Sequence, residues 1–232
     1  MSFIIEDLDA IIMSFMDLPE TVNLMQTNTY YYEKIKQQDL IKEWDVMKQE
    51  KNGNPDNIFA ISCANNYMTY AKSLIKRYKI NIHFNHERAF RDSCLHGNIL
   101  VAKWLIDLGE NHGYGQINIH TTDVFTYTAF ICACSNGHLK IAKWLINLGE
   151  NHGFGKINIH RNHYFNMDNA FEAACFIGHL KIAKWLINLG ENHGYGKINI
   201  RLKINEILTY SIGCRYFDLA KWLIELMEHH GY

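Results

Sequence analysis

One pattern of apolar and polar residues, with helical spacing, recurs along the chain. In the copy that covers residues 180–189, the polar residues Lys181, Lys184 and Asn188 form a narrow stripe. Every other position is apolar: Leu180, Ile182, Ala183, Trp185, Leu186, Ile187 and Leu189. This spacing predicts a helix that is buried on most of its circumference. Gly190 comes next, and we expect it to end the helix in the left-handed conformation.

A shorter apolar segment precedes each long one. In the same copy it reads AFEAAC, residues 170–175, and Asp168 or Asn169 is available as its N-cap. Gly178 separates the short segment from the long one. Each unit is therefore predicted to be a pair of helices joined by a tight turn.

The long-helix phrase occurs five times, at intervals of 31 to 41 residues, and begins at Ala71, Ala102, Ala142, Ala183 and Ala220. Such intervals are typical of helical solenoids, in which each unit packs only against its neighbours. We predict an all-α solenoid of about five helix pairs. Its approximate units are 57–83, 84–120, 121–160, 161–200 and 201–232. The length variation falls in one loop, GENHGYG or a relative of it, which the first unit lacks.

The recurring tryptophan of the long helix is expected to be fully buried between neighbouring units, where a large apolar side chain contributes roughly 1.5–3 kcal/mol. In units two to four it is Trp104, Trp144 and Trp185. The end units differ, as terminal repeats that face water do. Unit one has Ser73 at the tryptophan position and Asn66 in place of the turn glycine, and unit five has Arg215 at that glycine position.

Residues 1–50 follow a different pattern. Residues 17–20, DLPE, supply an N-cap acid, an early proline and a second acid for a helix that continues through Leu24. A third helix is expected between Tyr31 and Trp44, and the charged, turn-rich segment 48–57 predicts a boundary before a repeat domain at 57–232. An amphipathic helix is predicted ahead of these from Leu8, Ile11, Ile12, Phe15 and Met16.

Composition limits the class of partner. The 232 residues are 48% hydrophobic and 20% charged, with a net charge of -1, so the chain lacks the basic character that nucleic acids or anionic membranes attract. No apolar stretch approaches the length of a membrane span, and the acidic start lacks the basic region of a signal peptide. We therefore expect no nucleic acid or membrane partner. The chain should be intracellular and cytoplasmic, with its six cysteines as free thiols.

The phrase AFEAACFIGHLKIAKWLINLG, followed by INI, resembles the ankyrin repeat. The closest matches to the family's turn are Gly137-His138-Leu139 and Gly178-His179-Leu180, with Gly97-Asn98-Ile99 as a variant. The resemblance covers residues 57–230 and implies a protein-binding solenoid whose first helices and fingers form a concave binding face. It also implies that Gly-His makes a turn and a hydrogen bond between repeats. The family's Thr-Pro-Leu-His is replaced, and the loop after the long helix is enlarged.

The first 40 residues resemble a degenerate F-box, with residues 3–35 as the expected docking segment. The resemblance lies in IMSFMD at 12–17, VNL at 22–24 and YYYEKI at 30–35, while Ile4-Ile5 replace the family's opening Leu-Pro. F-boxes bind the Skp adaptor of cullin ubiquitin ligases. The resemblance implies an adaptor-binding surface made by Ile4, Ile5, Leu8, Ile12, Phe15, Leu18, Pro19, Val22 and Leu24. Such a segment joined to ankyrin units resembles proteins of large DNA viruses, which would place the chain in the host cytoplasm.

The thirteen histidines raise the question of metal binding. Equivalent positions on stacked helices are roughly 8–10 Å apart, whereas Zn–N bonds measure about 2.0–2.1 Å. Repetition alone therefore cannot bring His112, His152 and His193 to one ion. Weak binding at neighbouring pairs such as His229 with His230 stays open, but we expect no metal site.

Catalytic motifs are also missing. Cys63, Cys94, Cys134 and Cys175 recur at one position of the unit, as a small packing residue does. The GENHGYG loop lacks the Gly-Lys-Ser/Thr ending of a phosphate loop, and neither HExxH nor GxSxG occurs. We expect neither a cofactor nor enzymatic activity.

Comparison between the units separates shared from variable positions. The long helix and its loop are nearly identical in units two to four, whereas segments 83–93, 120–133, 160–174 and 201–213 diverge. Since Arg and aromatic side chains are common interface anchors, we predict that a target protein contacts Arg88, Arg91, Asp92, Phe125, Tyr127, His163, Tyr164 and Phe165. Alternatively, Phe125 and Phe165 only fill the enlarged fingers.

Two functions stay open at this point. The first is a monomeric adaptor that recruits a target protein to a cullin ubiquitin ligase. The second is a repeat scaffold or virion-associated interaction protein with no link to a ligase, in which the N-terminal helices only shield unit one.

Overall fold

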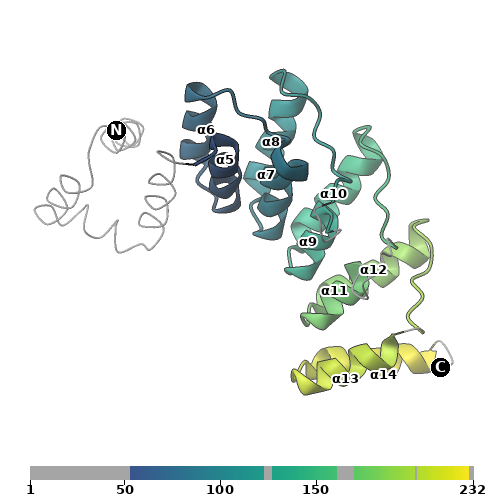
Figure 1. Ribbon diagram of the computed structural model, residues 1–232. Helices are drawn as coiled ribbons and strands as arrows, with labels where there is room; N and C mark the ends of the chain where they lie inside the picture. Colours follow the sequence, from purple (N-terminus) through teal and green to yellow (C-terminus); the bar gives the residue numbers. More distant parts are fainter. Residues whose placement is uncertain (1–52, 123–126, 161–169, 202, 230–232) are drawn as a thin grey trace, which may run out of the picture.

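The computed structural model describes residues 53–122, 127–160, 170–201 and 203–229, and within them ten α-helices form five pairs. The pairs stack side by side in a curved row (Figure 1). In chain order the pairs are α5 (Pro55–Ala64) with α6 (Met68–Arg77), α7 (Phe84–Leu95) with α8 (Ile99–Asn111), α9 (Ala129–Ser135) with α10 (Leu139–Asn151), α11 (Ala170–Phe176) with α12 (Leu180–Asn192), and α13 (Ile204–Gly213) with α14 (Phe217–His229).

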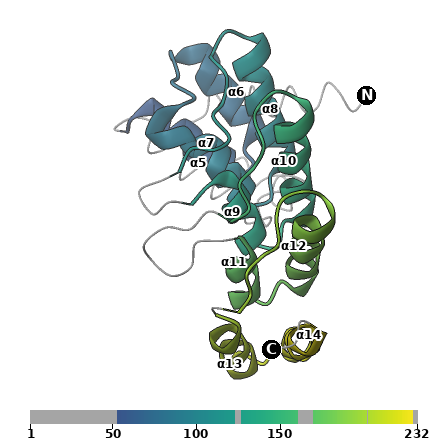
Figure 2. The same cartoon turned by 90° about the vertical axis from the view of Figure 1, so that its right-hand side faces the viewer.

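The helices form two layers, which Figure 2 shows from the side. The first helices α5, α7, α9, α11 and α13 pack directly against one another, and each first helix also packs against the second helix of its own pair. The predicted all-α solenoid of five helix pairs is thereby confirmed. The predicted N-terminal helices, with the adaptor-binding residues from Ile4 to Leu24, lie outside the described residues.

The first repeat begins earlier than its sequence boundary. Helix α5 starts at Pro55, and the Asn54 side chain accepts a hydrogen bond from the Asp56 backbone N–H over 2.8 Å. The segment 48–57 therefore contributes an N-cap and an N1 proline as well as a turn.

Each turn between paired helices needs a left-handed residue. Gly97, Gly137 and Gly178 have φ of 82°, 81° and 84°. An added Cβ on Gly137 would lie 2.8 Å from the His179 ring of the next unit, so both the backbone and the neighbour require glycine there. Asn66 and Arg215, which stand at this position in the end units, also adopt the left-handed conformation, with φ of 63° and 62°.

The expectation that Gly190 ends its helix is wrong. Helix α12 continues to Asn192, and the left-handed glycines are Gly194 and Gly196 in the following loop. Gly190 is needed for close approach instead, because an added Cβ would lie 2.5 Å from the Gly196 carbonyl oxygen. The loop thus folds back onto the end of its own helix.

The recurring tryptophans are half-buried, not fully buried as expected. Each ring packs against a fully buried phenylalanine from the first helix of the preceding unit, with ring centroids 6.0 Å apart for Phe59 and Trp104 and 6.2 Å apart for Phe90 and Trp144. The Lys72 ammonium lies 5.8 Å from the centroid of the Trp104 ring. The tryptophans therefore lie at the seam between units, where one edge faces solvent.

The strand-like finger of each unit is an irregular turn. In the INI phrase both isoleucines pack into the core, and the asparagine side chain accepts a hydrogen bond from the backbone N–H two residues later, as between Asn158 and His160 over 2.9 Å. An isolated bridge pairs Thr122 with Thr128, and the described residues contain no longer strand. None of the described helices is long and apolar enough to cross a membrane.

Candidate interaction surface

The first-helix layer carries the predicted target-binding residues of unit two. Arg88 donates through Nη1 to Oδ1 of Asn57, in the preceding unit, over 2.6 Å, and through Nε to Oδ2 of Asp92 over 3.1 Å. The side chains of Arg88 and Asp92 are partly exposed, at 33% and 21%. These two predicted residues therefore lie together on the surface, already paired with each other.

Arg91 is not at this surface. It is 5% exposed and donates to the backbone carbonyls of His86 (2.8 Å) and Asn85 (3.3 Å). Asn85, His86 and Glu87 all have left-handed φ values between 49° and 59°, a costly conformation for residues other than glycine. Arg91 holds this turn in place, which removes it from the surface that the prediction assigned to a partner.

Of the remaining predicted residues, Tyr127 is half-buried and packs against the hydrophobic core. In the next first helix, α9, every residue from Ala129 to Cys134 is buried. The other predicted target-binding residues lie outside the described residues: Phe125, His163, Tyr164 and Phe165. Their role stays a prediction.

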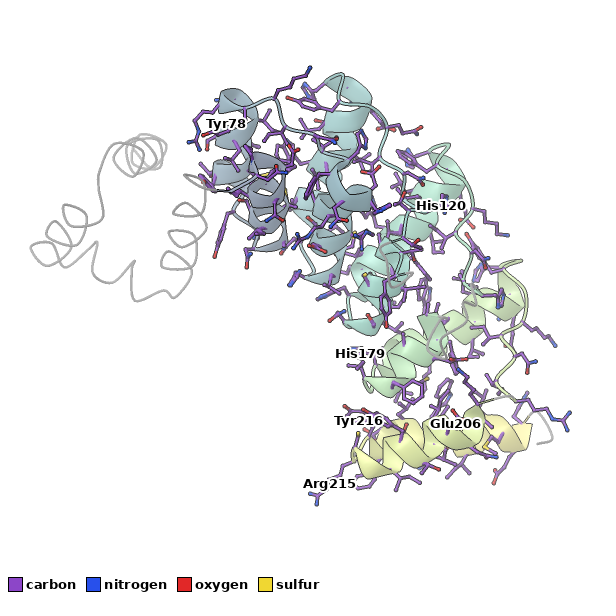
Figure 3. All side chains as sticks on the ribbon, in the orientation of Figure 1. Tyr78, His120, His179, Glu206, Arg215 and Tyr216 are labelled. Atoms are coloured by element: carbon purple, nitrogen blue, oxygen red, sulfur yellow. The ribbon has the colours of Figure 1, made fainter. Side chains whose placement is uncertain are left out.

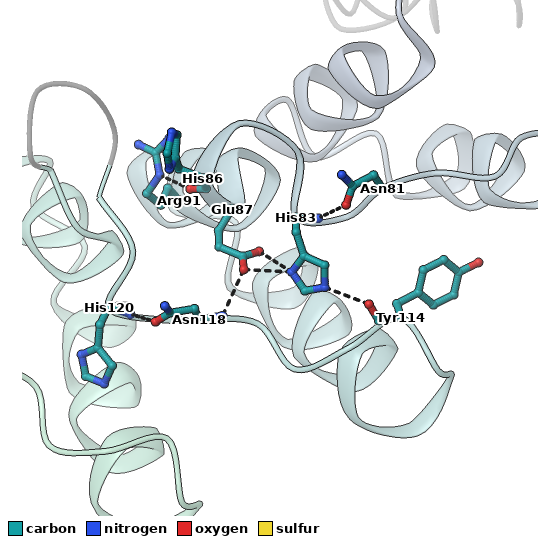
Figure 4. Close-up of polar contacts among 8 residues, drawn as sticks. All are labelled: Asn81, His83, His86, Glu87, Arg91, Tyr114, Asn118 and His120. Carbon is teal, nitrogen blue, oxygen red and sulfur yellow. Dashed lines mark hydrogen bonds and ion pairs between the residues drawn. The ribbon is translucent and has the colours of Figure 1, made fainter.

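A polar network at the start of unit two was missed by sequence reasoning (Figure 4). His83 donates through Nε2 to the Tyr114 carbonyl over 2.8 Å, and its Nδ1 lies 2.8 Å from Oε1 of Glu87. Glu87, only 6% exposed, also accepts from the Asn118 backbone N–H over 3.2 Å. Because both ring nitrogens face acceptors, the geometry favours the charged imidazolium.

The same network sets the protonation of His83. Burial opposes the charged ring, but the hydrogen bonds to Glu87 and Tyr114 and the Glu87 charge outweigh it and raise the pKa of His83. Glu87 links the start of its own unit to the finger of that unit through Asn118. Because Glu87 also pairs with His83 at the end of unit one, this carboxylate joins units one and two.

The contact between a finger histidine and the next unit's loop recurs twice. His120 donates through Nε2 to the Phe154 carbonyl over 2.8 Å, and His160 donates to the Tyr195 carbonyl over 2.7 Å. We call this contact, together with the loop's aromatic side chain, the aromatic latch. The recurrence of INIH with GENHGYG in the sequence is the signal that could have indicated it.

The latch buries the aromatic ring of the loop. Phe154 is 9% exposed and Tyr195 is 7% exposed. The Tyr195 hydroxyl donates to Oε1 of Glu150 in unit three over 2.7 Å, and the Lys156 ammonium lies 4.2 Å from the centroid of the Tyr195 ring. Lys156 also donates to the Gly194 carbonyl over 2.7 Å. The enlarged loops therefore tie each unit to the one before it.

A second series of contacts joins the helix turns. His138 donates through Nε2 to the Leu95 carbonyl over 2.9 Å, and Asn98 donates to the Ala64 carbonyl over 2.6 Å. His179 makes the corresponding hydrogen bond with the backbone of Ser135, and Figure 3 shows Tyr216 at the next turn. The inter-repeat hydrogen bond implied for Gly-His is present.

Burial governs the chemistry of these side chains. It lowers the pKa of His179 despite the hydrogen bond with Ser135, and it raises the pKa of Cys63, Cys134 and Cys175. No group of three potential ligands in the described ranges could hold a metal ion. None of the six cysteines, all of which lie in those ranges, forms a disulfide.

The surface of the last unit is more apolar than a water-facing cap requires. Ile212 is 52% exposed and Phe217 is 63% exposed, with Tyr210 and Ile224 also exposed. Ile212 replaces the buried cysteine of the other four units. Contacts also join this unit to unit four: Lys203 pairs with Glu172 over 3.1 Å, and the Tyr210 ring packs against Phe176 with centroids 5.1 Å apart.

Comparison with protein families identifies the repeat. Residues 86–146, which contain most of units two and three, match the model for ankyrin repeats (many copies). Residues 86–146 contain ankyrin repeats. A search of curated proteins gave no match. Ankyrin repeats form a protein–protein interaction module.

Proposed function

We propose that this chain is a non-enzymatic adaptor whose ankyrin repeats hold a target protein on the first-helix and finger side. The N-terminal segment would dock a Skp-type adaptor of a cullin ubiquitin ligase. The first part rests on the difference between the shared and the variable residues of a unit. The shared residues Trp144, Gly137 and His138 contact neighbouring units, whereas Arg88 and Asp92 of the variable segment 83–93 are partly exposed on the first-helix side.

The chemistry of the described residues supports a non-enzymatic role. A nucleophilic cysteine needs its thiolate form, but burial raises the pKa of Cys63, Cys134 and Cys175 and keeps them as thiols. The histidines His83, His120, His138 and His160 donate to backbone carbonyls of neighbouring units. These side chains serve packing.

The second part of the proposal rests on the F-box resemblance of residues 3–35. It is tested by co-purifying the full chain with a Skp-type adaptor, with and without the double substitution Ile12→Asp and Phe15→Asp. A matched control is Lys140→Asp, a charge change on the exposed face of α10. Binding that the double substitution abolishes and the control leaves intact supports the ligase link.

Adaptor binding that never occurs, or that survives the double substitution, favours the alternative of a repeat scaffold or virion-associated protein. The target-holding role would stand in that case, because it depends on the ankyrin units. The adaptor proposal places the chain in the cytoplasm, that of the host if a virus encodes it, as a monomer with one target protein.

A further inference from the structure

The aromatic latch has one fixed geometry in the ankyrin units. The aromatic residue comes three positions after the end of the second helix, at Tyr114 after α8, Phe154 after α10 and Tyr195 after α12. Each time a finger histidine of the preceding unit donates to the carbonyl of that residue. The distance along the chain and the acceptor atom are therefore the same in three consecutive units.

The groove that receives Tyr195 is made by unit three. Glu150 accepts from the hydroxyl, Lys156 lies over the ring and His160 holds the backbone carbonyl. Ile146 and Ile157 of the same unit are 7% and 5% exposed. An aromatic ring with one polar end suits such a groove, because the apolar body and the hydroxyl are both satisfied.

The equivalent groove of unit four is an open cavity. Its three polar residues, Glu191, Lys197 and Arg201, stand at the positions of Glu150, Lys156 and His160. All three line a hollow of about 380 Å³ together with Ile187, Ile198, Asn199 and Ile200. Ile187 and Ile198 are half-buried, whereas their unit-three counterparts are buried. The apolar floor of the unit-four groove is thus more exposed than that of unit three, where Tyr195 is bound.

The chain itself carries the residue that fits. Helix α14 ends at His229, the position that corresponds to Asn192 at the end of α12. Three residues later stands Tyr232, in a phrase EHHGY that matches ENHGY at 191–195. Three residues span at most about 10 Å, so the tether has the length that the other latches use.

We propose that the side chain of Tyr232 binds in the unit-four cavity and forms a fourth aromatic latch. Its hydroxyl donates to Glu191, the Lys197 ammonium lies over its ring, and Arg201 donates to its backbone oxygen. Arg201 has more N–H donors than the histidine it replaces and a longer side chain, so it serves the same acceptor. The latch ties the last unit to unit four.

Hydrogen exchange of the full chain tests this assignment, with Tyr232→Ala, Tyr232→Phe and the matched control His230→Ala. We expect Tyr232→Ala to speed exchange at the amides of 197–201 and of the last turns of α14 roughly tenfold to a hundredfold. Tyr232→Phe should keep most of the protection, because Phe154 forms the equivalent contact without a hydroxyl. Equal exchange in the Tyr232→Ala variant and the parent chain would overturn the proposal.

A double-mutant cycle locates the contact. Tyr232→Phe combined with Glu191→Gln should cost less than the sum of the two single changes, because each removes the same hydrogen bond. Strict additivity would refute the assigned hydroxyl partner. Protection of 197–201 that rises with protein concentration, together with a dimer in sedimentation, would assign the cavity to a second copy and overturn docking within one chain. Neither outcome depends on target binding or on a ubiquitin ligase.

Discussion

Tyr195 donates its hydroxyl hydrogen to Glu150 across the boundary between two helix-pair units, with 2.7 Å between the oxygens. The tyrosine belongs to the enlarged loop of unit four and the glutamate to the second helix of unit three. An insertion that lengthens the unit thus provides a contact between units. The enlarged GENHGYG loops therefore contribute to the packing between units, although in the sequence they resemble surface insertions.

The latch predicts how Tyr195 responds to substitution. Tyr195→Ala removes a ring that is 7% exposed and should destabilise the protein by about 3–5 kcal/mol. Tyr195→Phe keeps the ring and should cost only about 0.5–1.5 kcal/mol for the lost hydrogen bond. Urea unfolding followed by tryptophan fluorescence measures both. Equal costs would mean that the ring adds nothing beyond the hydroxyl.

Alanine substitutions at two glycines distinguish the cost of backbone strain from the cost of a steric clash with a neighbouring side chain. Gly153→Ala forces a φ of 75° on alanine with no heavy atom within 4 Å of the new Cβ, and should cost about 1–2 kcal/mol. Gly137→Ala has nearly the same φ, 81°, but its Cβ would lie 2.8 Å from the His179 ring. We expect a clearly larger loss of thermal stability for Gly137→Ala. Equal melting temperatures would show that the His179 ring moves away freely.

The pKa of His83 should lie above the ordinary value of 6.5, and that of His179 should lie below it. Burial opposes the charge of His83, but its hydrogen bonds to Glu87 and Tyr114 raise the pKa of this ring. Its stabilising contribution is therefore complete below pH 6.5 and is lost as the pH rises through the folded pKa. Resonances of the two rings in an NMR titration measure both values, and Glu87→Gln should lower that of His83.

The pKa of His179 is lowered, chiefly by burial, so its contribution has the opposite sign. It is complete above pH 6.5 and is lost as the pH falls through the folded pKa. A folded-state pKa of His179 above 6.5 would contradict the burial of this ring between the turns of units three and four.

Arg215 offers a stabilising change. It holds a left-handed φ of 62° at the position where the inner units have glycine. Arg215→Gly should stabilise the protein by about 1 kcal/mol, because glycine adopts this conformation without the cost that a Cβ brings. Arg215→Ala keeps the Cβ and serves as the control, with no gain. A stabilising Arg215→Ala would instead trace the effect to the guanidinium.

The repeat and its two helix layers could be predicted from the sequence because the same apolar pattern recurs in each unit. Trp144 and Gly137 were assigned to the stack on that basis. The burial of Arg91 could not be predicted, because it depends on three consecutive left-handed residues at 85–87, a turn that the helical pattern of the sequence does not indicate. The end of α12 was also misplaced, since Gly190 serves a loop contact that has no local sequence pattern.

The residues of the binding surface could be predicted only in part, for a related reason. Divergence between units identifies residues that the stack does not require, but not which of them reach solvent. Arg88 and Asp92 lie on the surface, and Arg91, one position before Asp92, lies beneath it. Side-chain direction at an irregular helix start decides the difference.

Site-specific photo-crosslinking tests the central claim most directly. A photoreactive phenylalanine replaces Tyr127 on the finger side or, in the matched chain, Asn147 on the exposed face of α10. We predict a discrete protein adduct from position 127 that position 147 does not give, when both chains are expressed at equal level in the same cells. The same adduct formed from position 147 and absent at position 127 would contradict the claim that the variable side of the ankyrin stack binds the partner.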